Sequence, residues 1–167
     1  MRNGKVSCAA FFHFAFLVPC YCFHLKMNLG LQEKVILVSG GAKGIGEGIS
    51  SVLAAEGAIP VIVGRNETDN ARALEAIQAA GGLGYAITAE LTQPEECERA
   101  VHLTLQRYGR LHGLVNNAGV NDGVGLEHGS YEAFMASLHK NLVHYYLLAH
   151  HALPALHRPR AAQAEVH

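Results

Sequence analysis

The sequence is poor in charge and in cysteine, and both shortages exclude broad classes of protein. Only 16% of its 167 residues are charged and the formal net charge is −1, so the chain lacks the basic surface of a nucleic-acid binder. Three of the four cysteines lie within the first 22 residues, and Cys97 stands alone in the remainder. This spacing is not a disulfide framework. It favours a reduced, cytoplasmic compartment.

A membrane-spanning helix needs about 20 consecutive apolar residues, and no run of that length occurs. Residues 1–26 come nearest, because a basic start precedes an apolar stretch over 8–23 in the outline of a signal peptide. His13 and Pro19 interrupt the stretch, no small-x-small cleavage site follows it, and Met27 opens a segment that resembles a natural start. We predict that 1–26 is an apolar extension outside the fold, with no membrane partner. Targeting or anchoring is the alternative.

From Lys34 onward, short apolar segments alternate with amphipathic segments of helical pattern. The apolar segments are typical of strands buried on both faces of a parallel sheet, and their alternation with helices predicts βαβ units. Thr92 is predicted to cap one helix, with Pro94 in its first turn. The expected strands cover 34–39, 58–64, 84–89 and 111–117, and the expected helices end at 56 or cover 67–81, 92–109 and 130–156.

The segment "SGGAKGIGEG" connects the first expected strand to the first expected helix. Gly40 permits a tight turn, Gly44 lets a pyrophosphate approach the backbone, and Gly46 allows close packing of helix on strand. Ile45 lies in the first turn of that helix, where free N–H groups and the dipole favour an anion. The flanking strand and helix match a dinucleotide-binding turn. A glycine-rich turn that binds no ligand is the alternative.

These elements predict an α/β fold, a Rossmann-type doubly wound parallel sheet truncated after about four strands. The predicted partial dinucleotide-binding domain spans 27–156. No Gly-Lys-Ser or Gly-Lys-Thr occurs, which excludes a P-loop. Residues 157–167 carry no buried-strand pattern where a fifth strand is expected, so we predict an irregular tail there.

The residue at the tip of the second strand decides which cofactor is preferred. An acid there binds the ribose 2′-OH of NAD, whereas an arginine accommodates the 2′-phosphate of NADP. The sequence has Gly64, Arg65 and Asn66 at this point, and no acid. Lys43 in the glycine-rich segment adds a second positive charge, so the pair predicts NADP, with NAD as the alternative. Two solvated surface cations would give the same pattern.

A second segment, "LVNNAG" at 114–119, ends the fourth expected strand. With "SGGAKGIG" at the observed spacing, it resembles the short-chain dehydrogenase/reductase family. The resemblance implies that Asn117, Ala118 and Gly119 line the adenosine and ribose side of a nicotinamide cofactor. It also implies that Glu90 binds the adenine amino group, where an aspartate is common. Oxidoreductase activity, a small-molecule substrate and a homo-oligomer are expected from the family.

The segment "KNLVHYY" at 140–146 extends this resemblance. Asn141 stands where the family carries an active-site asparagine, which kinks its helix and holds a water in a proton relay. The surrounding residues resemble the sugar-oxidising branch of the family, the bacterial L-fucose dehydrogenases, which oxidise C1 of the sugar to a lactone. By this resemblance Asn121 and Asp122 face the substrate, a sugar or alcohol. A solvent-exposed Asn-Asp-Gly turn is the alternative.

Three positions depart from the family pattern. Ser39 replaces the usual threonine and can make the same local bonds. Glu90 replaces an aspartate with a longer acid. His112 stands where an aspartate often precedes the fourth strand, so we expect weaker support of the adenine side.

The resemblance covers about 28–156, roughly the first half of a family domain. Catalysis in the family uses a serine, and a tyrosine whose pKa is lowered by a lysine four residues later. Unperturbed tyrosine has a pKa of about 10, too high for a base at neutral pH. No Tyr-x-x-x-Lys occurs in the 167 residues, Tyr145 and Tyr146 included. We predict descent from an oxidoreductase without turnover by this chain. A non-catalytic nucleotide-binding fragment or a pseudogene product are the alternatives.

Four histidines, the last at His157, lie in or beside the final expected helix. They have no cysteine or carboxylate partners at the spacing of a metal site. We therefore predict no metal and interpret them as helix-surface side chains.

Overall fold

Four parallel strands form one sheet in the order β3-β2-β1-β4. The computed structural model describes residues 29–157, so the predictions for residues 1–26 and for the tail beyond residue 157 lie outside the described residues. Because β4 pairs with β1 and not with β3, the chain reverses its direction across the sheet after β3. The strands are β1 (Val35–Ser39), β2 (Ile59–Gly64), β3 (Tyr85–Thr88) and β4 (Gly113–Val115).

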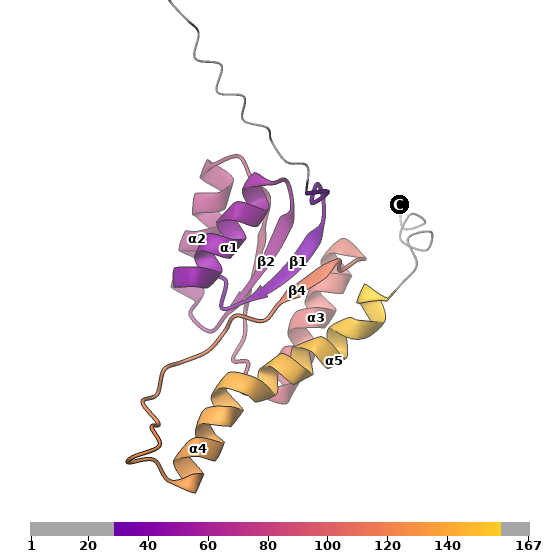
Figure 1. Cartoon of the computed structure of the whole chain (residues 1–167). Helices are drawn as coiled ribbons and strands as arrows, with labels where there is room; N and C mark the ends of the chain where they lie inside the picture. Colours follow the sequence, from indigo (N-terminus) through magenta and orange to yellow (C-terminus); the bar gives the residue numbers. More distant parts are fainter. Residues whose placement is uncertain (1–28, 158–167) are drawn as a thin grey trace, which may run out of the picture.

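Helices cover both faces of this sheet. In Figure 1, α1 and α2 lie on one side of the strands, and α3 and α5 lie on the other. The chain thus confirms the predicted α/β, doubly wound architecture. The helical segments are α1 (Gly44–Ala55), α2 (Glu67–Ala79), α3 (Pro94–Tyr108), α4 (Tyr131–Leu138), the π-helical turn η1 (His139–Val143) and α5 (His144–Leu156).

Side chains of the central strand β1 are buried on both faces, as its uninterrupted apolar sequence predicts. Successive side chains point to opposite faces of a strand. Leu37 packs in a cluster with Leu148 of α5 and other apolar residues of α3 and α5. Ile36 and Val38 belong to a second cluster beside α1. The two apolar layers fix the strand register and therefore the alignment of the strand ends.

One local prediction is wrong in detail. Thr92 is not the cap of α3: the helix begins at Pro94 with Gln93 at the N-cap position. The hydroxyl of Thr92 instead donates to Oε1 of Glu90, 3.0 Å away, so a side chain that could cap the helix is used in the preceding turn. The long helical stretch predicted over 130–156 is confirmed, because α4, η1 and α5 follow one another without a gap.

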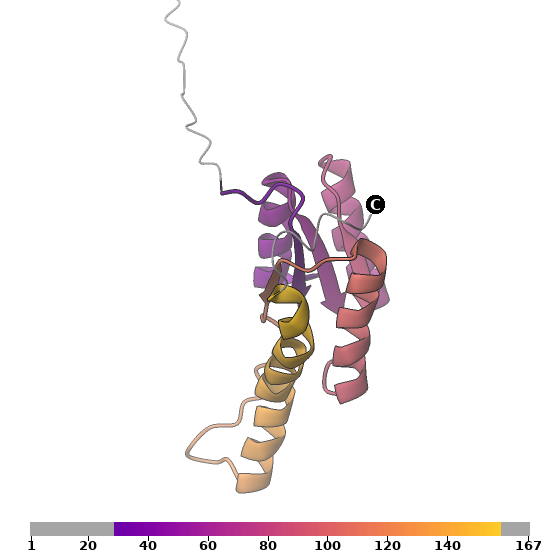
Figure 2. The same ribbon diagram turned by 90° about the vertical axis from the view of Figure 1, so that its right-hand side faces the viewer.

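Residues after β4 leave the sheet and return as one long helical segment. Figures 1 and 2 show α4 and the loop before it extending beyond the carboxyl ends of the strands, while α5 packs back beside α3. The Ser130 hydroxyl accepts a hydrogen bond from the Ala133 N–H at 3.1 Å and so caps α4. This arrangement brings the start of α5 close to the ends of the strands.

Candidate functional site

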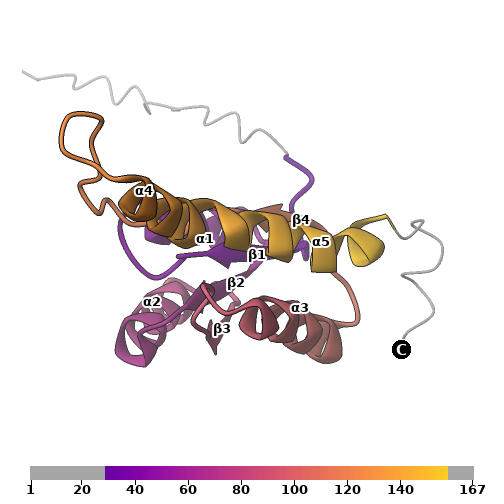
Figure 3. The same ribbon diagram turned by 90° about the horizontal axis from the view of Figure 1, so that it is seen from below.

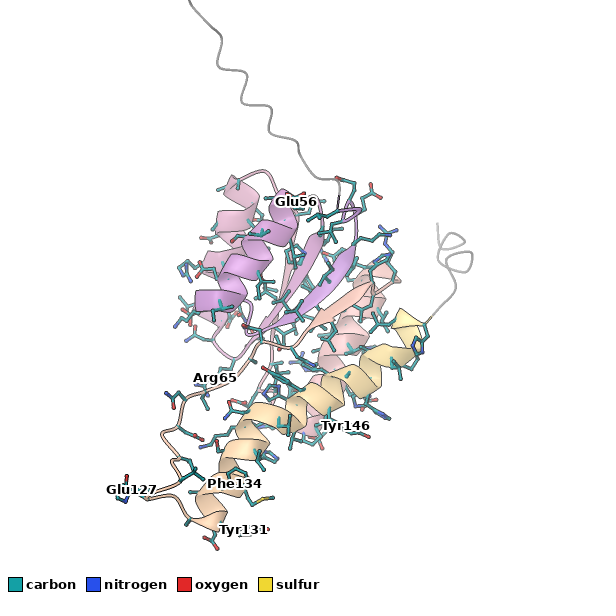
Figure 4. The ribbon with its side chains drawn as sticks, viewed as in Figure 1. Glu56, Arg65, Glu127, Tyr131, Phe134 and Tyr146 are labelled. Carbon is teal, nitrogen blue, oxygen red and sulfur yellow. The ribbon has the colours of Figure 1, made fainter. Side chains whose placement is uncertain are left out.

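A cavity of about 790 Å³ opens at the carboxyl ends of the strands, the end that faces the viewer in Figure 3. Segments that follow all four strands contribute to its lining. Figure 4 shows Arg65 at this end of the sheet and Glu56 at the opposite end. The lining residues are Gly40, Ala42, Lys43, Ile45, Val63, Gly64, Arg65, Asn66, Asp69, Asn70, Ala89, Glu90, Leu91, Thr92, Asn117, Ala118, Gly119, Val120, Lys140 and His144.

The buried Ser39 hydroxyl ties the end of β1 to the turn after β4. It accepts hydrogen bonds from the backbone N–H groups of Asn117 and Ala118, at 2.9 and 3.1 Å. It also donates to the carbonyl of Val115 at 3.3 Å. The Asn117 amide donates to the carbonyls of Ser39 and Gly40, at 3.1 and 3.2 Å. One serine and one asparagine therefore hold the glycine loop against "NNAG", and serine suffices where the family has threonine.

The three glycines Gly40, Gly46 and Gly44 differ in how much space a Cβ atom would have at each position. A Cβ on Gly40 would lie 2.9 Å from the Cα of Ala118, and its φ of +65° is left-handed. A Cβ on Gly46 would collide with the carbonyl of Gly40 and the amide of Asn117. Gly44 has a φ of +54° with no atom within 4 Å of its Cβ position. The first two permit close packing, and the third leaves open space beside the helix end, where a phosphate group would fit.

The N-terminus of α1 borders this open space. Its N-cap residue, Lys43, supplies no side-chain hydrogen bond to the first turn, whereas Asn66 caps α2 by accepting from the Asp69 N–H at 3.0 Å. The first N–H groups of a helix need acceptors, and an anion is well suited to provide them. The residues around Gly44 therefore fit the pyrophosphate of a dinucleotide.

The tips of β2 and β3 form the other end of the cavity. Glu90 accepts from the Thr92 backbone N–H at 3.2 Å, and its second oxygen lies 4.0 Å from the Arg65 guanidinium. Asn70 donates to the carbonyl of Gly64 at 2.9 Å, which leaves its buried Oδ1 without a protein partner. This corner carries exposed positive charge on Arg65 and hydrogen-bonding groups beneath it.

All the predicted cofactor residues line the cavity except Gly44 and Gly46, which lie in the first turn of α1. Sequence reasoning missed other lining residues, of which Asp69 is the most consequential. Its carboxylate lies 2.7 Å from the ammonium of Lys43. Asp69 lies in the first turn of α2, four residues after Arg65, so its closeness to the strand tip could have been expected from helical geometry.

Asn141 lies in η1 and connects the helix to the turn after β4. Its Oδ1 accepts from the Val120 N–H at 2.7 Å, and its amide donates to the Ser137 carbonyl at 3.0 Å. It does not line the cavity itself, but its helical neighbours Lys140 and His144 do. The irregular turn at the predicted position of the helix kink is present, and the catalytic role of Asn141 stays a prediction.

Asn121 and Asp122 do not line the cavity. Asn121 accepts from the Gly123 N–H at 3.2 Å, an exposed turn of the kind that Asn-Asp-Gly favours. Asp122 accepts from the Ser137 hydroxyl at 3.0 Å and lies 3.6 Å from the Lys140 ammonium. Both side chains therefore have partners within the chain, and their contact with a substrate stays a prediction.

The expected effect of His112 on the adenine side is wrong. His112 precedes β4 at the amino ends of the strands, opposite the cavity, where its Nδ1 accepts from the Val35 N–H at 3.0 Å. Partial burial lowers its pKa, and the nearby Lys34 and Arg110 lower it further. The imidazole thus replaces a carboxylate as a hydrogen-bond acceptor for the start of β1.

His144, one of the four histidines predicted to lie on a helix surface, is instead the buried titratable group in the cavity wall. Its Nε2 lies 3.0 Å from the carbonyl of Lys140, so Nε2 carries the proton and Nδ1 is left without a partner. Burial is the main cause that lowers its pKa. The remaining histidines form no metal centre: within 29–157, no group of three or more His, Cys, Asp or Glu side chains could hold an ion. None of the helices in that range is long and apolar enough to cross a membrane.

The sheet order, the glycine loop and the cavity at the carboxyl ends define a Rossmann-type α/β protein. The family model for short chain dehydrogenases matches residues 34–165. The chain therefore belongs to the short-chain dehydrogenase/reductase family, whose members are oxidoreductases that use NAD(P) and act on small molecules.

Individual relatives are similar over part of their length. An uncharacterized oxidoreductase of Methylorubrum extorquens is 40% identical over 98 residues, 58% of this chain and 40% of that protein. The 1,6-dihydroxycyclohexa-2,4-diene-1-carboxylate dehydrogenase of Pseudomonas putida is 40% identical over 93 residues, 56% of this chain and 34% of that one. The crystal structure of an NADH-dependent reductase, A1-R′, complexed with NAD is 30% identical with a TM-score of 0.71, covering 78% of this chain and 55% of that one.

This chain thus spans less than half of the two curated relatives. The likeness to L-fucose dehydrogenases is not established by these comparisons and stays a prediction.

Proposed function

We propose that this chain forms the nucleotide-binding half of an NAD(P)-dependent oxidoreductase. The observation that carries the proposal is the single cavity that joins the glycine loop to the tips of β2 and β3 and to the turn after β4. A dinucleotide is the kind of ligand that needs an anion site and an adenosine site on one surface.

Each end of the cavity has a task in this proposal. The N–H groups at the start of α1 bind the pyrophosphate, and Gly44 leaves room for it. Glu90 and Arg65 meet the adenosine end, and Ala118 and Gly119 line the adenosine and ribose side that the family resemblance implies. The nicotinamide, when bound, supplies the hydride acceptor or donor. The chain's own residues hold the cofactor so that one face of it is open to a substrate.

The positive charges on Lys43 and Arg65 favour NADP over NAD in this proposal, because both side chains line the adenosine end of the cavity. The proposed substrate class is a sugar or alcohol, with L-fucose-like aldose oxidation as the specific candidate. That choice is supported only by the sequence resemblance around Asn121 and Asn141.

We further propose that the 167-residue chain binds nucleotide without turning over substrate. No tyrosine in it is followed four residues later by a lysine, so the tyrosine–lysine pair that moves the proton in the family is not among these residues. If the chain is a non-catalytic nucleotide-binding protein, it is also expected to bind nucleotide without turnover. If it is a pseudogene product, it is expected neither to fold nor to bind nucleotide.

Calorimetric titration of the full chain with NAD and NADP tests the proposal. We expect binding of both, and binding at least tenfold weaker in Gly44→Asp, which places a negative charge in the open space beside α1. The matched control is Gly81→Asp, because Gly81 also has a left-handed φ and open space at its Cβ position but lies at the far end of α2. A folded wild-type chain that binds neither nucleotide would refute the proposal.

A coupled absorbance assay then separates binding from turnover. With NADP, L-fucose and simple alcohols, we expect no production of NADPH by the chain. Production of NADPH that depends on substrate would show that the proposed lack of turnover is wrong, while leaving the proposed nucleotide site intact.

A further inference from the structure

The cations that favour NADP are not free in this structure. The Lys43 ammonium lies 2.7 Å from the Asp69 carboxylate. The Arg65 guanidinium lies 4.0 Å from the Glu90 carboxylate. All four side chains line the same cavity, so its adenosine end carries two positive and two negative charges.

Asp69 is held in place by the structure around it. The Asn66 side chain accepts from the Asp69 N–H and fixes the first turn of α2. One turn further, Arg72 bridges to the glycine loop by donating to the carbonyl of Ala42 at 2.9 Å and to Glu47 at 2.7 Å. The bond from Arg72 also lowers the pKa of Glu47. These contacts set the distance between α2 and the loop, so the Asp69 carboxylate stays beside Lys43 without depending on that ion pair alone.

The two cofactors differ at this corner by a 2′-phosphate in place of a 2′-hydroxyl, and charge is the difference that Asp69 senses most directly. A phosphate monoester brings about −1.5 to −2 charges at neutral pH, whereas a hydroxyl brings none. The Asp69 side chain is only 20% exposed, so its charge is less screened than that of a fully solvated acid. It repels a 2′-phosphate and competes with it for Lys43, and it has no such effect on a 2′-hydroxyl.

We propose that Asp69 is a cofactor-specificity residue, which lowers the affinity of this site for a 2′-phosphate relative to a 2′-hydroxyl. The inference rests on the proposed nucleotide site and deepens it. By this role, Asp69 limits the NADP preference that the charges of Lys43 and Arg65 alone would predict.

The test compares Asp69→Asn with wild type by calorimetric titration with 2′,5′-ADP and 5′-AMP, and with NADP and NAD. Asparagine keeps the size of the side chain, and the Asn66 cap is preserved because it uses the backbone N–H. We expect the affinity ratio of 2′,5′-ADP to 5′-AMP to rise about tenfold, as one like charge at close range is removed. The affinity for 5′-AMP and NAD should change less than twofold.

Glu67→Gln is the matched control. It removes one negative charge from the same helical turn, but Glu67 is exposed and does not line the cavity. The variant should therefore have the wild-type ratio of affinities for 2′,5′-ADP and 5′-AMP. Asp69→Ser is a second variant with the same expected direction, for use if the asparagine variant does not fold. Lys43→Gln should lower the ratio, and the loss should be larger when Asp69 is already Asn, because Lys43 is then free for the phosphate.

The outcomes distinguish the two proposals. Binding of all four ligands with an unchanged ratio in both Asp69 variants, or an equal rise in Glu67→Gln, overturns the role of Asp69 and leaves the nucleotide site standing. Failure of the folded wild-type chain to bind any of the four overturns the nucleotide site, and the specificity role with it.

Discussion

The two sides of the cavity are built differently. On one side, the glycine-loop region (residues 35–72) combines strands that are almost fully buried with a loop whose close contacts leave no room for a Cβ at Gly40 or Gly46. On the other side, the helical arm (residues 120–146) exposes large apolar side chains to solvent. Tyr131, Phe134 and Tyr146 are seen along it in Figure 4, and Tyr131 is 73% exposed.

The two sides of the cavity are also held in place by different contacts. The glycine-loop region is held by ion pairs within it and by the hydrogen bonds that join Ser39 and Gly40 to the turn after β4. The helical arm is attached to the rest of the chain by the Asn116 amide, which donates to the Tyr145 carbonyl at 3.2 Å, and by α5, which continues from it and packs on α3 and the sheet. Exposed apolar side chains gathered on one element are typical of interaction surfaces.

The largest expected effect concerns two residues on opposite faces of α5. Leu148 is fully buried, whereas Tyr146, two positions earlier, is 68% exposed. Leu148→Ala should lower the free energy of unfolding by about 2–5 kcal/mol, because it leaves a cavity among tightly packed side chains. Tyr146→Ala should change it by less than about 0.5 kcal/mol. Urea unfolding of both variants, followed by circular dichroism, measures the difference. Equal losses would mean that the outer face of the arm is already packed in solution.

Two glycines of α1 give a smaller but sharper contrast. Gly46→Ala should cost about 1–3 kcal/mol, since its Cβ meets the Gly40 carbonyl and the Asn117 amide and forces the loop to shift. Gly48→Ala, with nothing near its Cβ position, should raise stability by roughly 0.5–1 kcal/mol, because alanine favours a helix over glycine. Thermal unfolding of the two variants checks the opposite signs. A neutral Gly46→Ala would show that the glycine loop is not closely packed.

The same contrast marks how far the sequence could predict the molecule. Strands and glycine loop were predictable because apolar runs and glycine spacing act locally, and Ser39, Asn117 and Gly46 meet as the motifs imply. The contacts of Asp69 and His112 were not predictable, because each side chain contacts a group that is distant in sequence. Asp69 pairs with Lys43, and His112 accepts from the Val35 backbone N–H. The π-helical turn at Asn141 likewise depends on a bond to Val120 that no helical periodicity reveals.

The smallest expected effect is a dependence of stability on pH that involves both regions. Burial lowers the folded-state pKa of His112 and of His144. The groups that act on them are Lys34 and Arg110 at His112, and Glu90, His139 and the Lys140 carbonyl at His144. The unfolded chain, with a histidine pKa of about 6.5, then binds more protons than the folded chain at mildly acidic pH. Stability should therefore be complete above about pH 6.5 and fall as the pH is lowered through the folded pKa values.

Urea unfolding at pH 7.5 and pH 5.5 measures this loss, and His112→Asn assigns part of it. The amide oxygen of asparagine can accept from the Val35 N–H without taking up a proton, so the variant should lose less stability between the two pH values than wild type. His128→Asn is the control, because His128 is highly exposed and makes no hydrogen bond to β1. An equal loss in all three chains would show that the acceptor role of His112 does not limit stability. His144, at the wall of the cavity, would then be the next histidine to replace.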